Sequence, residues 1–287
     1  QLASGNDDMS VNGNPLFGNA TGAAGLVNLA ITAGSVCNNE ALPGMATDDY
    51  NNTSRDNSLP VGTPDIGAYE MARGTAAGTW IGVIDTDWNK AGNWDNNTIP
   101  TASTNVYIVK GHKTTGGIDD MPVIPTGVAN CRNLNLLMPY SKVLVNNAGQ
   151  LRIAGAISSK GILDIVNGTI EFFGISGTQT IAGSMFKNNT VLNLIVNNNI
   201  DLVNLQMPAA PENDTLNITG AVSFKGNNRA LNTYSAAAPS LGMLTLKSNF
   251  GSTARIADIS NSNTNTGNTI TGNVTVERYI SYGKKWH

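Results

Sequence analysis

The second half of the chain repeats a short pattern, in which two apolar residues flank one residue that is mostly polar. This period of two is typical of a β-strand with one buried and one exposed face. The pattern therefore predicts many short strands with a common inward face. The triplets are 106–108, 134–136, 143–145, 151–153, 163–165, 170–172, 192–194, 216–218, 222–224, 244–246 and 274–276.

Turn residues separate the triplets, as in Asn146-Asn147-Ala148-Gly149 and Asn167-Gly168. Some triplets lie about 17–24 residues apart, which is the length of one solenoid coil of two or three strands. A β-sandwich would also contain many short strands, but it needs only about seven of them, joined by hairpins. The pattern favours an all-β, right-handed parallel β-helix, that is, a β-solenoid, in one or two stacked parts.

Composition supports strands and turns over helices. The chain of 287 residues has 39 Asn, 28 Thr and 31 Gly, and only 13% of its residues are charged. Thr favours strands, while Asn and Gly tolerate the backbone conformations of tight corners. The net charge of −3 comes without a basic stripe, and no apolar run approaches the roughly 18 residues of a membrane span. We therefore expect neither nucleic-acid binding nor membrane insertion.

Three segments are predicted. Residues 1–72 form one unit, which we interpret as the closing part of a parallel β-helix. Residues 73–79 are small and flexible and read as a linker. Residues 80–287 form a second solenoid segment. The first residue is not Met and no signal peptide is visible, so we expect the chain to be part of a longer protein.

Three of the four tryptophans, Trp80, Trp88 and Trp94, fall within fifteen positions just before the repeats. Indole faces could form a platform on which sugar rings stack. Alternatively, the three rings form a cap over the apolar end of the solenoid. The position of the cluster, at the start of a new stack of coils, favours the cap.

Two groups of motifs resemble known bacterial proteins. Asn14-Pro15-Leu16-Phe17 followed by Asp65-Ile66-Gly67-Ala68-Tyr69-Glu70 resembles the C-terminal region of secreted right-handed β-helix proteins, a group that includes adhesin-like proteins and some polysaccharide lyases. The region 88–278 looks like the repeat segments of very large surface proteins exported by type IX secretion. The matching features are Trp88-x5-Trp94 with Ile99-Pro100, Tyr107-Ile108-Val109, Cys131-Arg132-Asn133-Leu134, Thr180-Ile181-Ala182-Gly183, Ala254-Arg255-Ile256-Ala257 and Gly272-Asn273-Val274-Thr275-Val276-Glu277-Arg278-Tyr279-Ile280.

These resemblances imply a secreted protein at the cell surface, and they carry no catalytic motif. They also imply that secretion machinery would recognise a C-terminal sorting domain that the chain lacks. The partners expected on this basis are cell-surface or extracellular glycans, or other copies or segments of the parent protein. Fold alone does not imply an activity.

The residues that usually carry chemistry are sparse. The only histidines are His112, in a turn, and His287, and nothing suggests that a third group orients either of them. Cys37 and Cys131 lie far apart and form no disulfide framework or zinc motif. We predict no catalytic residues and no cofactor. If a metal binds, it is calcium, with Asp85, Asp87 and Asp95, or Asp48 and Asp49, as candidate ligands.

Three functional hypotheses follow. The first is a non-catalytic structural or adhesive segment of a large secreted cell-surface protein. The second is an accessory C-terminal region of a polysaccharide-degrading, lyase-like β-helix enzyme whose catalytic coils would lie upstream. The third is a carbohydrate-binding module that uses the tryptophans. We favour the first, because the outward positions of the triplets are mostly Asn, Thr, Arg and Ser.

Overall fold

The computed structural model describes residues 13–32, 35–37, 41, 46–52, 55, 64–70, 77–108, 112–113, 119–174, 177–203, 214–234, 243–260, 263–264 and 266–280. These residues form strands and two single-turn 3₁₀ helices, with no α-helix among them. The strands are β1 (Phe17–Asn19), β2 (Asn28–Ile31), β3 (Ala77–Thr79), β4 (Asn105–Ile108), β5 (His112–Lys113), β6 (Asp119–Asp120), β7 (Val123–Cys131), β8 (Leu134–Leu136), β9 (Lys142–Ile153), β10 (Ile157–Ser159), β11 (Ile162–Phe172), β12 (Thr178–Ile181), β13 (Phe186–Val196), β14 (Asn199–Leu202), β15 (Leu216–Ile218), β16 (Ala221–Phe224), β17 (Ala230–Asn232), β18 (Leu244–Leu246), β19 (Arg255–Ile256), β20 (Thr269–Thr271) and β21 (Val274–Val276); the helices are η1 (Ala91–Asn93) and η2 (Gly183–Met185).

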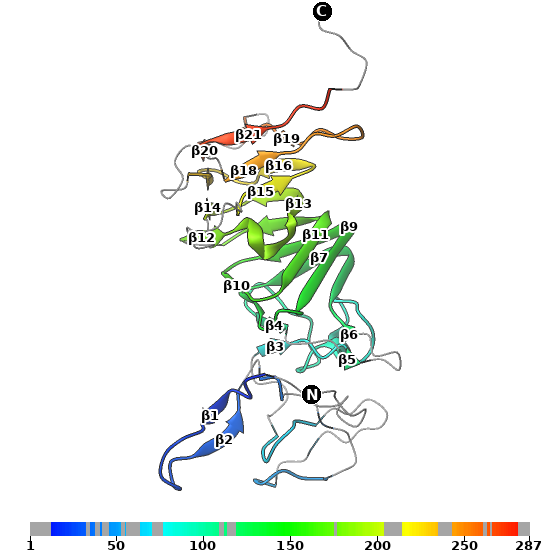
Figure 1. Ribbon diagram of the computed structural model, residues 1–287, viewed down its shortest axis with the longest axis vertical. Helices are drawn as coiled ribbons and strands as arrows, with labels where there is room; N and C mark the ends of the chain where they lie inside the picture. The colour runs from blue at the N-terminus through cyan, green and yellow to red at the C-terminus, as the bar shows by residue number, and fades with distance from the viewer. Residues whose placement is uncertain are drawn as a thin grey trace, which may run out of the picture.

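The strands stack in parallel along the long axis of the molecule (Figure 1). One large sheet runs in the order β7-β9-β11-β13-β15-β18-β21, and all of these neighbours pair in parallel. Two smaller parallel sheets, β3-β4-β8-β10 and β12-β14-β17-β20, form another side. The chain therefore winds through about six turns, and the prediction of an all-β parallel solenoid is confirmed.

Each coil has three sides, because the long strands of the large sheet turn a corner. In β9, two stretches with alternating buried residues are separated by three exposed residues, 146–148. The triplets 143–145 and 151–153 thus belong to one bent strand, and 163–165 and 170–172 share β11 in the same way. We call the part before the corner the first side and the part after it the second side. The third side is formed by β8, β10, β12, β14, β17 and β20.

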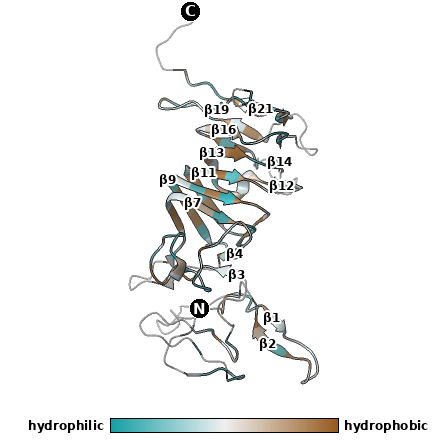
Figure 2. Ribbon diagram, turned by 180° about the vertical axis from the view of Figure 1, so that it is seen from behind, coloured by the Kyte–Doolittle hydropathy of each residue, from teal (hydrophilic) through white to brown (hydrophobic). Residues whose placement is uncertain are grey.

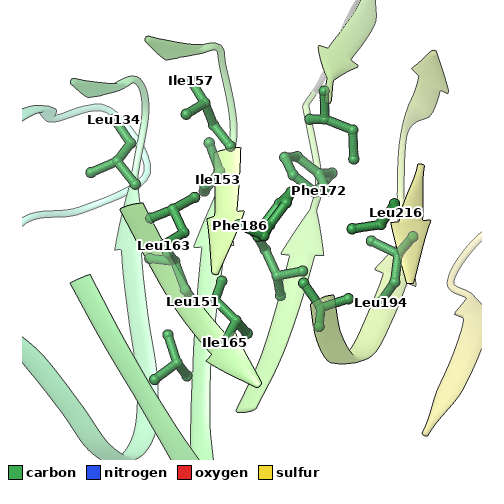
Figure 3. Packing of buried hydrophobic residues seen from close by; sticks show 14 of the residues in the cluster. Leu134, Leu151, Ile153, Ile157, Leu163, Ile165, Phe172, Phe186, Leu194 and Leu216 are labelled. Atoms are coloured by element: carbon green, nitrogen blue, oxygen red, sulfur yellow. The ribbon is translucent and has the colours of Figure 1, made fainter. Parts of the chain in front are cut away.

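Apolar side chains of successive coils stack into columns inside the solenoid (Figure 3). On the second side, strand pairing places Leu151 on Ile170, Ile170 on Leu194, and Leu194 on Val222. All four side chains are fully buried. Brown, apolar segments alternate with teal, polar ones along these strands (Figure 2), as the triplet pattern predicts. One continuous apolar core therefore extends from the tryptophans to β21.

The triplet 192–194 is placed differently from the prediction. Leu192 and Leu194 were predicted to point inward together, but only Leu194 is buried. The inward residue before it is Val191, because the corner falls between Val191 and Leu194. A short run of apolar residues does not reveal where a strand turns, so the sequence pattern alone misses this corner.

Coil length varies along the chain and is smallest between β9 and β11. Leu151 pairs with Ile170, 19 positions later, and Ile170 pairs with Leu194, 24 positions later. On the third side, however, Leu231 pairs with Ile270, 39 positions later. At the start of the solenoid, Val106 pairs with Leu134, 28 positions later. The predicted spacing of about 17–24 residues therefore holds for the coils from β7 to β13, and the coils before and after them have longer connections.

The N-terminal part differs from the prediction. We interpreted residues 1–72 as parallel coils, but the strands described there, β1 and β2, form an antiparallel hairpin. The predicted linker 73–79 is also too long, since β3 pairs in parallel with β4 and belongs to the solenoid. A small apolar cluster of Ile31, Val36 and Cys37 packs against Leu137 and Met138 of the solenoid. A turn-rich sequence with isolated apolar patches does not distinguish antiparallel from parallel strand pairing.

Leu194→Ala should lower the free energy of unfolding by about 2–5 kcal/mol. The side chain is fully buried, and its loss leaves a cavity that the stacked neighbours cannot fill. Chemical denaturation followed by circular dichroism would measure this loss.

The matched control is Leu192→Ala, which removes the same atoms two positions away in the same strand. Because Leu192 is only partly buried, its loss should be clearly smaller. Equal losses at the two positions would contradict the register of β13.

Candidate functional site

The three clustered tryptophans lie at the N-terminal end of the solenoid core. Backbone bonds fix them there: the Trp80 N–H donates to the Tyr107 carbonyl (3.0 Å), and the Trp88 N–H donates to the Val123 carbonyl (2.9 Å). The side chains of Trp80, Trp88 and Trp94 are 2%, 0% and 1% exposed. No indole face is therefore open to a sugar ring in this structure.

The indoles pack edge to face around Trp94. Its ring centroid lies 5.0 Å from that of Trp80 and 4.7 Å from that of Trp88. The Trp94 Nε1–H donates to the Trp88 carbonyl (2.8 Å), and the Trp80 Nε1–H donates to the Asp120 carbonyl (2.7 Å). This packing covers the end of the apolar core. It supports the interpretation of the three tryptophans as a cap rather than as a platform for sugar rings.

The aspartates near the cap serve as hydrogen-bond acceptors in turns. Asp85 Oδ1 accepts from the Asp87 N–H and from Asn93 Nδ2, both at 2.9 Å. Asp85 Oδ2 pairs with Lys90, and this bond chiefly lowers the pKa of Asp85. Asp95 Oδ1 accepts from the Thr79 N–H (3.0 Å). These carboxylates organise the loop that carries the tryptophans.

Asp48 and Asp49 lie in the N-terminal part and do not meet the other three candidates. Asp49 Oδ2 accepts from the Glu70 N–H (2.8 Å), and Glu70 in turn lies 3.3 Å from Arg55. The Arg55 guanidinium also donates to the Asp65 carbonyl (2.7 Å). Arg55 thus binds the turn that contains the Asp65–Glu70 motif, and within the described residues no three His, Cys, Asp or Glu side chains group as metal ligands.

The remaining predicted groups contribute little that resembles a catalytic site. Cys37 and Cys131 are buried and unbonded to each other, and burial raises the pKa of the Cys131 thiol far above its usual range. The backbone of His112 lies in the two-stranded β5–β6 ladder, and His287 lies outside the described residues. Among the described helices, none has the length and apolar character to cross a membrane.

The most highly organised charged group lies on the second side, at an outward position of β11. The carboxylate of Glu171 is completely buried, although the middle residue of a triplet points away from the core. It accepts hydrogen bonds from Gln150 (2.6 Å), Arg152 (2.9 and 3.2 Å) and Asn197 (2.7 Å), and Lys225 Nζ lies 3.4 Å away. Glu171 and these donors together span four successive coils, with Gln150 and Arg152 in the coil before Glu171 and Asn197 and Lys225 in the two coils after it.

Two further contacts hold the same arginine. The Arg152 guanidinium stacks over the Phe173 ring at 4.3 Å, and its Nη1 donates to Asn130 (3.4 Å). Burial alone raises the pKa of Glu171, but the bonds from Arg152 and Asn197 outweigh it and lower the pKa. Glu171 is therefore a saturated carboxylate ion, which suits a structural role and not that of a proton donor.

Asp164 forms a similar group on the first side. Its Oδ2 lies 3.1 Å from Lys142 Nζ and 2.8 Å from Lys187 Nζ, so one carboxylate again lies between two cations from neighbouring coils. Burial raises its pKa, and the two lysines lower it by more. None of these residues stands out in the sequence, because their partners are 19 to 54 positions apart.

One corner of the solenoid has a different character. The exposed residues Thr126, Asn146, Asn147 and Asn167 lie between the first and second sides in three successive coils. We call them the corner ridge. Within the described residues, their side chains hydrogen-bond to no other group. The ridge therefore offers a row of uncommitted amides and one hydroxyl to solvent.

The chain matches no known protein in these comparisons: no family model, no curated protein and no solved structure is significantly similar to it. The resemblance to secreted β-helix and surface proteins therefore stays a prediction.

Trp94→Phe should destabilise the protein more than Trp88→Phe. Both changes shrink a buried ring, but only Trp94→Phe also removes a buried hydrogen bond, to the Trp88 carbonyl. We expect an additional loss of about 1–2 kcal/mol. Thermal unfolding of both variants measures the difference. Unchanged melting temperatures in both would contradict the cap.

Glu171→Gln should lower the free energy of unfolding at pH 7 by about 1–3 kcal/mol, since charge-assisted bonds are lost. The pKa of Glu171 is lowered in the folded state, so its contribution is present above the unfolded-state pKa and is lost as pH falls through the folded-state pKa. The difference between wild type and variant should therefore shrink below about pH 4.

The control for this experiment is Glu277→Gln. Glu277 pairs with Lys247 at the surface, where both side chains are 39% exposed. Solvent screens such pairs, so little change in stability is expected at any pH. A loss at neutral pH as large as that for Glu171→Gln would show that burial is not the source of the effect.

Proposed function

We propose that the chain is a non-catalytic structural and adhesive segment of a large secreted cell-surface protein. The structural part of this proposal rests on the ladder of outward polar groups on the second side. Glu171 and its donors span four successive coils, so the outer surface, like the core, connects each of these coils to the next. A rod that is bonded in this way both inside and outside suits an extended spacer.

The adhesive part of this proposal rests on the corner ridge. Amide groups donate and accept hydrogen bonds in the way that sugar hydroxyls require, and the ridge residues have no competing partner in the described structure. Repetition from coil to coil aligns them with the long axis at a rise of about 4.8 Å per coil. An extended glycan could therefore contact several coils at once, and many weak contacts would add up.

The test is retention of the protein on immobilised polysaccharides. The triple variant Asn146→Ala, Asn147→Ala and Asn167→Ala should be retained clearly less than wild type. Its melting temperature should stay the same, because exposed substitutions usually change stability by less than about 0.5 kcal/mol. Retention that is unaffected by the triple variant would contradict the ridge as the adhesive surface.

A matched control lies on the third side. Thr178 and Thr180 of β12 are also exposed and uncommitted within the described residues. The variant Thr178→Ala with Thr180→Ala should be retained like wild type. In the same samples, release of soluble sugar fragments would overturn the non-catalytic part of the proposal and favour the polysaccharide-degrading alternative.

A further inference from the structure

Strand β11 carries two buried carboxylates, one on either side of the corner ridge. Asp164 lies three positions before the ridge residue Asn167, and Glu171 lies four positions after it. Because an extended chain spans at most about 3.6 Å per residue, the two backbone positions lie within about 11 and 14 Å of Asn167. The groups around these carboxylates therefore flank the ridge on the first and the second side.

Each carboxylate has more positive charge around it than it can neutralise. Two cations approach each of them: Lys142 and Lys187 on the first side, and Arg152 and Lys225 on the second. We call each carboxylate with its two cations a basic group. Each basic group has one surplus positive charge, so the ridge lies between two such charges.

Solvent meets the cations of these groups and not the anions. The side chains of Asp164 and Glu171 are 7% and 0% exposed. The side chains of the three lysines, in contrast, are 40%, 49% and 60% exposed. The carboxylates are thus covered, and an approaching ligand encounters ammonium groups.

The lysines can bind a further anion while they keep their present partners. An ammonium group has three N–H donors, and contact with one carboxylate oxygen occupies one of them. A hydrogen bond from a cation to a carboxylate is about twice as strong as one between neutral groups. An anionic ligand on the ridge would therefore gain contacts that a neutral ligand could not make.

The surrounding coils do not oppose an anionic ligand. Residues 121–200 contain five basic and two acidic residues, for a net charge of +3, and the two acidic residues are the covered ones. The next acidic position along the first side is Asp87, which strand pairing places three coils before Asp164. That is about 14 Å along the axis. The ridge and its flanks thus form a locally positive surface on a chain of negative net charge.

We propose that the corner ridge binds an acidic polysaccharide, whose carboxylates contact the lysines of the basic groups while its hydroxyls bond to the ridge amides. This inference rests on the proposed adhesive function of the ridge and specifies the class of glycan. A polymer of uronic acids combines both kinds of group along one extended chain. One surplus charge on each side suits such a chain better than the dense phosphates of a nucleic acid.

Retention on immobilised polygalacturonate, compared with the same polymer after methyl esterification, tests the requirement for charge. In calcium-free buffer of low ionic strength, wild type should bind the acid at least about tenfold more tightly than the ester. Added salt should remove this difference, because it screens exposed charges. Equal retention on both polymers, or retention on neither, would overturn the acidic class of ligand.

The variant Lys142→Gln with Lys225→Gln tests the basic groups. It removes the surplus charge of each group and leaves each carboxylate one cation, so circular dichroism should stay unchanged. We expect about tenfold weaker binding to polygalacturonate and unchanged binding to the ester. Lys225→Gln alone, which leaves the first-side group intact, should give part of the loss. Binding to polygalacturonate that neither variant weakens would overturn the inference.

The matched control is Lys90→Gln with Lys247→Gln. It makes the same change in net charge, but these lysines pair with Asp85 and Glu277, outside the coils that carry the ridge. It should bind polygalacturonate like wild type. A loss as large as that of Lys142→Gln with Lys225→Gln would overturn the inference, because attraction would then follow net charge alone.

The triple variant of the ridge, Asn146→Ala, Asn147→Ala and Asn167→Ala, separates this inference from the proposed function. It should bind both polymers less tightly, whereas loss of the lysines should affect the acid only. If the triple variant weakens binding to both polymers and the lysine variant weakens neither, the adhesive ridge stands and its acidic ligand is overturned.

Discussion

Stacking of identical positions from coil to coil is the constraint on which the rest of the structure depends. Each parallel strand satisfies its backbone groups with the strands above and below it, and this fixes the register. The register places Leu151, Ile170 and Leu194 in one column, so a single inward pattern, repeated, produces a continuous core. The same register aligns the outward residues, and Glu171 can therefore accept hydrogen bonds and ion pairs from three other coils.

Much of the fold could be predicted from the sequence because the core-facing strands alternate strictly. The triplets 134–136, 216–218, 244–246 and 274–276 coincide with β8, β15, β18 and β21. Third-side strands such as β17, with a single buried residue, carry too little pattern to be recognised. The corner before Leu194 was missed for a related reason: a corner changes which residues point inward without changing their hydrophobicity.

The site could be predicted only in part. The tryptophans are conspicuous in the sequence, and their position before the repeats favoured a cap, which agrees with their burial. Whether an indole is exposed or buried, however, depends on the loop around it, here fixed by Asp85 and Asn93. The Glu171 group was not predictable, since it joins residues up to 54 positions apart and requires the register of every intervening coil. The corner ridge was anticipated only as a general excess of Asn.

The variation in coil length shows that the width and the length of the solenoid are set separately. Each turn advances the chain by one strand spacing, about 4.8 Å, whatever its number of residues. The interval of 19 residues between Leu151 and Ile170 and that of 39 between Leu231 and Ile270 therefore give the same axial advance. Insertions in the connections between strands change the width of the solenoid and its local chemistry. Only the gain or loss of whole turns changes its length.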